Sequence, residues 1–264
     1  MSSILRLIVQ RISLALIVLI GVSMLIFSIA RLIPGDPARI ALGPNATVEQ
    51  VEILRETLHL NDPIYLQYGY FVRDISQGDL GGSLYTNRPV TTDIAQFLPA
   101  TLELVIVAGI MMICIGLPLG MISARYKGQF IDNLLRVVSL LGVSAPSFVW
   151  AVILMLLFAY FLPIFPVAGR IEDTYVIKAV TGFLLIDTLI DGNIDAFFNA
   201  FWHIFLPAFA LSLSGIGQAA RLTRANMIET YNKPYIEMMR AYGISPFRIA
   251  SRYAFKPSLI PSLT

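Results

Sequence analysis

The chain has 264 residues, of which 56% are hydrophobic and only 14% are charged, and its formal net charge is +2. A soluble domain has about 25% charged residues, so this chain has too few charges to cover a water-facing surface. The composition excludes an ordinary soluble enzyme, and the high apolar content excludes a disordered chain. The chain has no run of Lys and Arg, so we expect no nucleic-acid partner. Cys114 is the only cysteine, which excludes an internal disulfide and a cysteine-based metal site.

Stretches free of Asp, Glu, Lys and Arg predict the membrane spans, because a spanning helix needs about 20 consecutive apolar residues. Four such stretches are complete, and they cover residues 12–30, 104–124, 137–169 and 196–220. The third is long enough for one span and a following loop, and a fifth begins at Pro257. We expect an all-α, polytopic membrane protein with four complete transmembrane helices and the start of a fifth.

The basic residues predict the orientation of the chain, because Lys and Arg are concentrated on the cytoplasmic side of membrane helices. With the N-terminus inside, the inner segments hold 12 of the 19 basic residues and 3 of the 17 acidic ones. We therefore expect a multi-pass protein of the cytoplasmic membrane with a cytoplasmic N-terminus.

These spans divide the chain into three parts. Residues 1–33 form the N-terminal cytoplasmic end and the first span, and residues 34–98 form an extracytoplasmic segment with short helices. Residues 99–264 form the core, with the second to fourth spans, a cytoplasmic loop at 225–255 and the start of the fifth span.

The two outer segments carry local helix signals. Thr47 and Gln50 have the spacing of a capping box, which predicts an amphipathic helix over 47–58. A second helix is predicted over 63–76. In the later outer segment Asp187, Asp191 and Asp195 recur every four residues, which favours a solvated helix face over a metal site because no His or Cys accompanies them.

The inner segment 221–256 combines seven basic residues with regularly spaced apolar ones, which a structureless loop does not need. Residues 235–242 predict two helical turns, and Gly243 predicts the helix stop. Ser245 and Pro246 predict the cap and start of a second short helix over 247–255. The resulting apolar ridge suits docking into a groove of another protein, and packing on the chain's own membrane helices explains it equally well.

The same segment resembles the Glu-Ala-Ala-x-x-x-Gly loop of ABC importer permeases. Glu237 and Gly243 match the ends of this motif, Met238 and Met239 replace its alanines, and Lys256 replaces the proline of its later Leu-Pro. Four further stretches resemble the dipeptide/oligopeptide permease family, in its first-subunit branch. In the family's order, they are LIPGDPAR at 32–39, GDLGGS at 78–83, LPATLE at 98–103 and SAPSF at 144–148.

The resemblance implies the type I permease fold of ABC importers and a set of partner proteins. These partners are a second, related permease in a heterodimer, two ATP-binding subunits on the cytoplasmic side and an extracytoplasmic substrate-binding protein. ATP and Mg²⁺ belong to the partner subunits, so we expect no cofactor, no metal and no catalytic residue in this chain. Since family members usually have six spans, the chain looks like a permease that stops after its coupling loop. The implied coupling helix, which contacts the ATPase, contains Tyr235, Glu237, Met238, Met239, Arg240, Ala241, Tyr242 and Gly243.

Other features agree with a transport subunit driven from outside the chain. It has no Gly-x-x-x-x-Gly-Lys-Ser/Thr stretch for ATP. Its four predicted spans contain no Asp, Glu, Lys or Arg in their interiors, where a proton- or sodium-coupled carrier normally places such groups. A stand-alone secondary transporter and a membrane-embedded enzyme are the competing hypotheses, and no clustered catalytic constellation supports the second. Pro118 and Pro146 lie inside predicted spans, where a pathway-lining bend or a packing kink explains them. Dipeptides, oligopeptides, glutathione and nickel complexes are all open as cargo.

Overall fold

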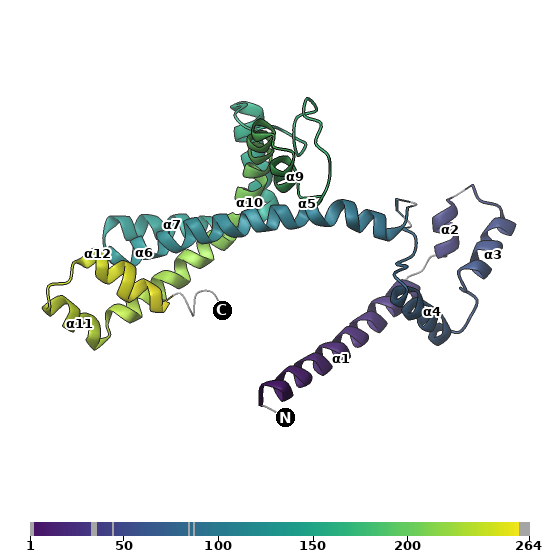
Figure 1. Ribbon diagram of the computed structural model, residues 1–264, viewed down its shortest axis with the longest axis horizontal. Coiled ribbons are helices and arrows are strands. Elements are labelled where there is room, and N and C mark those ends of the chain that lie inside the picture. Colours follow the sequence, from purple (N-terminus) through teal and green to yellow (C-terminus); the bar gives the residue numbers. More distant parts are fainter. Residues whose placement is uncertain (1–2, 33–35, 44, 84, 87, 259–264) are drawn as a thin grey trace. The chain divides into compact units, whose positions relative to one another are not determined.

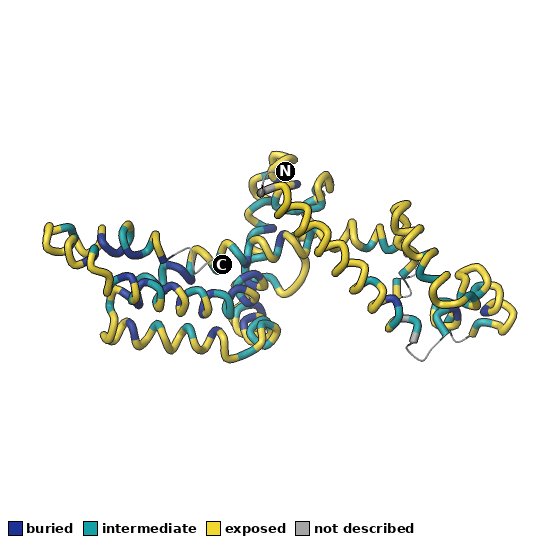
Figure 2. Tube along the Cα trace, turned by 90° about the horizontal axis from the view of Figure 1, so that it is seen from below, coloured by how far each residue is buried: buried dark blue, intermediate teal, exposed yellow. Residues whose placement is uncertain are grey.

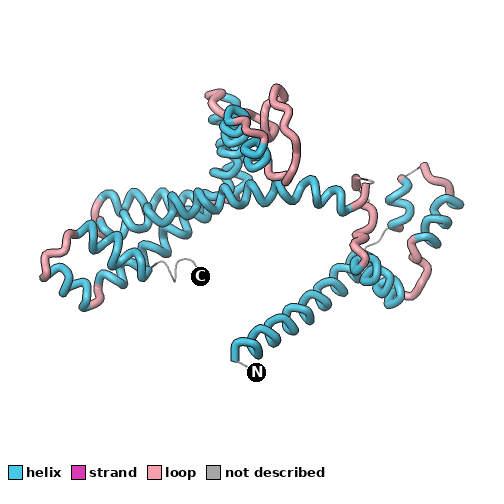
Figure 3. The backbone as a smooth tube through the Cα atoms, viewed as in Figure 1, coloured by secondary structure: helices cyan, strands magenta, loops and turns pink. Residues whose placement is uncertain are grey.

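The computed structural model describes residues 3–32, 36–43, 45–83, 85–86 and 88–258. Helices and loops make up these ranges, which contain no strand beyond an isolated bridge between Gly82 and Pro89 (Figure 3). The all-α prediction is confirmed. The Pro34–Gly35 pair of the first motif, and the predicted fifth span from residue 259 onward, lie outside the described residues.

Two compact units divide the chain, Met1–Ala95 and Gln96–Thr264. The first unit contains α1 (Ser3–Leu32), α2 (Pro37–Leu42), α3 (Val48–Thr57) and α4 (Ile64–Ser76) (Figure 1). The predicted capping box is present at α3, where the Thr47 side chain accepts from Gln50 N and the Gln50 side chain accepts from Thr47 N. Both short helices predicted here are confirmed.

α1 is almost entirely exposed along its length, as the yellow tube in Figure 2 shows. Its end is held to α4 by Phe27, whose ring lies 5.5 Å from that of Tyr68 and 5.4 Å from that of Phe71. A hydrogen bond of 2.8 Å also joins the hydroxyls of Ser23 and Tyr68. Because lipid is as apolar as these side chains, an apolar exposed face is expected for a membrane helix.

The second unit is built around one long helix, α10 (Ile194–Tyr231). It packs against α6, α7, α8 and α9. α5 (Val90–Met111) continues through a π-helical turn into α6, and the remaining elements follow in chain order. These are α6 (Leu117–Arg125), α7 (Phe130–Ser144), α8 (Ser147–Met155) with the π-helical turn Leu156–Phe161, α9 (Leu184–Ile190), α11 (Pro234–Ala241), α12 (Pro246–Arg248) and the π-helical segment Ile249–Ala254.

Small residues let α10 approach its neighbours closely. A Cβ added at Gly217 would lie 2.3 Å from the carbonyl oxygen of Ser139 on α7. At Gly120 on α6 it would lie 2.6 Å from the carbonyl oxygen of Ala220 on α10. These contacts leave no room for a side chain, which is how membrane helices gain packing contacts without a hydrophobic driving force.

Within the described residues, three helices are long and apolar enough to span a membrane. They are Leu5–Ile29, Val90–Arg125 and Ile194–Tyr231, and a bent pair makes a fourth if it counts as one span. In that pair, the chain bends by 102° between α7 and α8. The stretch 137–169, predicted to hold one span and a loop, therefore contains a helix break at Pro146, and the described residues give three candidate spans, or four with the bent pair, against the four predicted. Pro146 has no N–H for the helix and disfavours helical angles at the preceding residue, and Ala145 is extended at φ −124° and ψ 149°.

Candidate functional site

Residues 232–258 form a helical hairpin after the end of α10, and we call this segment the hairpin. Its first helix, α11, ends in a Schellman motif: Ile244 N donates to Met239 O at 3.1 Å and Gly243 N donates to Arg240 O at 3.0 Å. Gly243 has φ +71°, a backbone conformation that a residue with a Cβ adopts only with strain. Ser245 then caps the second helix by accepting from Arg248 N. The predicted helix-turn-helix is present.

The hairpin is fastened to the membrane helices through its second half. Ala254 is fully buried in a cluster with Ala124 of α6 and Met227 of α10. The first half is held in turn by the second, since Tyr235 Oη donates to Tyr253 O at 3.3 Å and α11 packs against the segment Ile249–Ala254. Figure 2 shows buried residues gathered where the hairpin meets these helices.

Ile236 is the buried contact of α11, with none of its surface exposed. Sequence reasoning missed it, because the apolar spacing of the segment highlighted Tyr235 and Met239, which are only half-buried. A signal was present, since Ile236 is the most apolar residue of a helix whose other large apolar side chains are Tyr and Met. The hairpin therefore has one apolar face turned toward its own chain.

Apart from the half-buried Tyr235 and Met239, the predicted coupling helix is exposed. Met238 is 53% exposed, Tyr242 is 77% exposed, and Phe247 of the second helix is 63% exposed. Glu237, Arg240, Ala241 and Gly243 are exposed as well. The structure thus combines both interpretations of the apolar ridge: Ile236 and Ala254 pack internally, and Met238, Tyr242 and Phe247 are available to another surface.

A groove of about 580 Å³ runs between the hairpin and the ends of α6 and α10. Arg125, Lys127 and Arg240 all line it, and no carboxylate is among the described residues around it. The Arg125 guanidinium also lies 6.0 Å from the ring centroid of Phe247. The exposed apolar side chains therefore stand beside a basic groove.

A buried ion pair joins α7 to α10 near the hairpin. Asp132 on α7 has none of its surface exposed, and its carboxylate accepts from Arg224 Nε at 2.7 Å and Nη2 at 2.9 Å. Ser123 Oγ and Gly128 N complete the shell at 2.6 and 2.8 Å. The sequence analysis used Asp132 only as one of the acidic residues on the inner side. A signal for its pairing was present, because Asp132 is the one acidic residue between Lys127 and Arg136.

A second cluster holds the loop between the π-helical turn Leu156–Phe161 and α9. Glu103 on α5 is 5% exposed and accepts from Arg170 Nη2 at 2.8 Å and from Leu185 N at 2.6 Å. Asp187 is 2% exposed and accepts from Thr181 N and Oγ1 and from Gly182 N. Burial acts to raise the pKa of Asp187, but these hydrogen bonds outweigh it and hold the pKa below its usual value. The predicted solvated face is therefore wrong at Asp187, which organises the loop.

The two prolines differ in what they do to the helices. Pro146 stands at the sharp bend between α7 and α8, whereas Pro118 follows a π-helical turn in a helix that runs on as one 36-residue element. Neither observation assigns a transport pathway, and the predicted lining role of both prolines stays a prediction.

Comparison with known proteins identifies the kind of protein that carries this hairpin. The family described as binding-protein-dependent transport system inner membrane component matches residues 116–264, and the N-terminal membrane component of the same system matches residues 4–105. The chain belongs to this family. It is a multi-pass membrane permease and a transport subunit rather than an enzyme.

Several relatives resemble the permease over most of its length. A probable D,D-dipeptide transport system permease protein, DdpB of Escherichia coli K12, is 41% identical over 94% of this chain and 73% of its own. The dipeptide transport permease DppB of Alkalihalophilus pseudofirmus is 38% identical over 97% of this chain and 77% of its own. DppB of Escherichia coli K12 is 32% identical over 98% of this chain and 78% of its own. The family resemblance found in the sequence motifs is confirmed.

Proposed function

We propose that this permease forms half of a peptide pathway through the cytoplasmic membrane and that its hairpin is the contact with a separate ATPase subunit. In this proposal the second half is a related permease, and a substrate-binding protein delivers di- or oligopeptides from outside. ATP binding and hydrolysis on the partner subunits drive the helices between inward- and outward-open states. ATP and Mg²⁺ bind those partners and not this chain.

The observation that carries the proposal is the two-sided construction of the hairpin. Ile236 and Ala254 connect it to its own membrane helices, and Met238 and Tyr242 stand one helical turn apart on the free surface. Apolar residues at this spacing are typical of a helix that docks in a groove of another protein. A partner that moves the hairpin would move α6 and α10 with it.

The charge distribution supports a cytoplasmic hairpin and N-terminus. Basic residues collect on the hairpin and on the neighbouring ends of α6, α7 and α10, as the positive-inside rule requires of the cytoplasmic side. Peptide cargo is supported by the relatives, which are named as dipeptide permeases.

The coupling contact is tested with Gly243→Pro and Glu237→Lys in the assembled importer. Proline fixes φ near −65° and removes the N–H that bonds to Arg240 O, so the end of α11 is lost. We expect peptide uptake to fall to background for both variants, with membrane insertion unchanged. Co-purification of the ATPase subunit should fall in parallel.

Gly192→Pro is the matched control. Gly192 has φ +70° and donates to Leu189 O, so the backbone damage is of the same kind, but it lies in the loop before α10. This variant should retain ATPase co-purification. Normal uptake by both hairpin variants would refute the coupling contact, and uptake by the permease alone in liposomes, without an ATPase, would refute the importer mechanism.

A further inference from the structure

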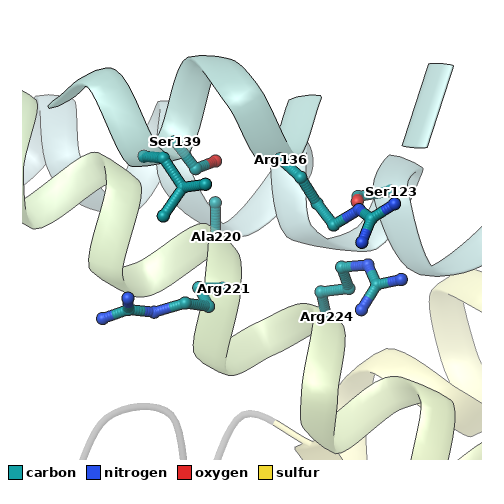
Figure 4. Close-up of a pocket in the computed structure, with 7 residues that line it drawn as sticks. Ser123, Arg136, Ser139, Ala220, Arg221 and Arg224 are labelled. Carbon is teal, nitrogen blue, oxygen red and sulfur yellow. The ribbon is translucent and has the colours of Figure 1, made fainter. Parts of the chain in front are cut away.

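A small pocket lies between α6, α7 and α10, on the side of the buried Asp132. It has a volume of about 140 Å³, and its lining includes Ser123, Arg136, Leu140, Ala220, Arg221 and Arg224. Figure 4 shows Arg136 and Arg224 ending beside one another near Ser123, while Arg221 extends from α10 in the other direction. Guanidinium groups therefore stand at two edges of one pocket.

The charges of this pocket are not balanced within the described chain. Both oxygens of Asp132 are already occupied by Arg224, Ser123 and Gly128 N. Arg136 Nε is 3.9 Å from Asp132, and its Nη2 donates to the Asn133 side chain. Arg221 makes no ion pair or hydrogen bond in the part of the chain that the structure describes. Asp132 thus neutralises one of three guanidinium charges, and the pocket attracts an anion.

The position of the pocket relative to the apolar stretches of the helices indicates which anion it binds. The charge-free stretch 137–169 begins directly after Arg136, and the charge-free stretch 196–220 ends directly before Arg221. Both guanidinium groups therefore come from the last residues outside the apolar stretches, where the phosphates of a bilayer lie. Beyond Arg136, Val137, Leu140 and Leu141 of α7 are 54%, 57% and 53% exposed.

We propose that this pocket binds the phosphate of an anionic phospholipid, with its acyl chains along the exposed face of α7. Arg136 contacts the phosphate, Arg221 attracts the anion from the opposite edge of the pocket, and Arg224 contributes its field while it stays paired with Asp132. Basic pockets between membrane helices favour such headgroups. A free phosphate shares the anionic chemistry, but it would leave Val137, Leu140 and Leu141 without a partner. The inference does not depend on the cargo or on the ATPase contact.

The test measures lipid binding to the delipidated full-length permease by native mass spectrometry. Phosphatidylglycerol, phosphatidylcholine and inorganic phosphate are the three probes. We expect tighter binding of phosphatidylglycerol than of the other two. Arg136→Gln with Arg221→Gln should weaken phosphatidylglycerol binding by about 5-fold for each arginine removed.

Arg248→Gln with Arg252→Gln is the matched control, because it removes the same charge from exposed positions of the hairpin. It should leave phosphatidylglycerol binding unchanged. Should the glutamine pair lower the unfolding temperature, Arg136→Lys with Arg221→Lys keeps the charge, loses the planar fork and should weaken binding less. Equal binding of the two lipids, an equal loss in the control, or phosphate binding as tight as phosphatidylglycerol binding would each overturn the proposal.

Discussion

Arg224 on α10 donates two parallel hydrogen bonds to the carboxylate of Asp132 on α7. The two residues are 92 positions apart in the sequence. The pair is shielded, since the Asp132 side chain is 1% exposed and the Arg224 side chain is 22% exposed. Arg224 lies one turn before Met227, which packs against Ala254 of the hairpin. The ion pair and the hairpin are therefore attached to the same stretch of α10.

Asp132→Asn should destabilise the permease strongly. The variant leaves the Arg224 guanidinium partly buried without its counter-charge, and breaking a buried pair costs about 3–5 kcal/mol. Thermal unfolding in detergent measures the loss. Asp191→Asn, at an exposed acid in the α9–α10 turn, should unfold at the wild-type temperature. An Asp132→Asn protein as stable as that control would show that the pair contributes nothing to the fold.

Ile236→Ala and Tyr242→Ala should separate the two faces of α11. Removing the buried Ile236 side chain should cost about 2–5 kcal/mol locally, so amide exchange over the hairpin should accelerate. Tyr242 is 77% exposed, so Tyr242→Ala should leave exchange unchanged and weaken co-purification of the ATPase. The opposite pattern, with faster exchange only in Tyr242→Ala, would contradict the assignment of the faces.

Gly217→Ala should destabilise the helix crossing, because the new Cβ would lie 2.3 Å from the backbone oxygen of Ser139. Overpacking of this kind costs about 1–3 kcal/mol. Gly109→Ala is the control, since a Cβ there meets nothing within 4 Å and should stabilise α5 by about 0.5–1 kcal/mol. Unfolding temperatures of the two variants should therefore move in opposite directions, and a common direction would argue against the close approach.

Low pH should loosen the segment after α1. Asp36 caps α2 by accepting from Ala38 N, and Arg55 of α3 donates to its carboxylate with Nε at 3.1 Å. The hydrogen bond from Arg55 holds the pKa of Asp36 below its usual value. A lowered pKa means that the stabilisation is present above the unfolded pKa of about 3.9 and is lost as the pH falls through the folded pKa.

Amide exchange in α2 and α3 should then be unchanged between pH 7 and 5, after correction for intrinsic rates, and should increase relative to α4 near pH 3. Arg55→Gln raises the folded pKa toward the unfolded one and should remove most of this difference. Loosening that appeared on raising the pH instead would contradict the ion pair.

The sequence predicted features that depend on neighbours along the chain. The capping box at Thr47, the stop at Gly243 and the cap at Ser245 each involve residues within a few positions of one another, so local chemistry was sufficient. The motif with Glu237 and Gly243 likewise pointed to the correct family. The bend at Pro146 was harder to predict from the sequence, because the composition of a stretch shows how apolar it is and not the direction of its helix axis.

Apolar length, charge asymmetry and short motifs, all properties of the sequence by itself, determined that this protein is a helical membrane permease with a hairpin near residue 240. Only the tertiary structure decided that Ile236 packs inward while Tyr242 stays free, that Asp187 and Glu103 are buried, and that Asp132 is held by Arg224. The physical reason is that burial and ion pairing depend on which distant helices pack together. The packing of α10 against α7 brings Arg224 to Asp132, whereas the loop before α9 covers Glu103 and Asp187.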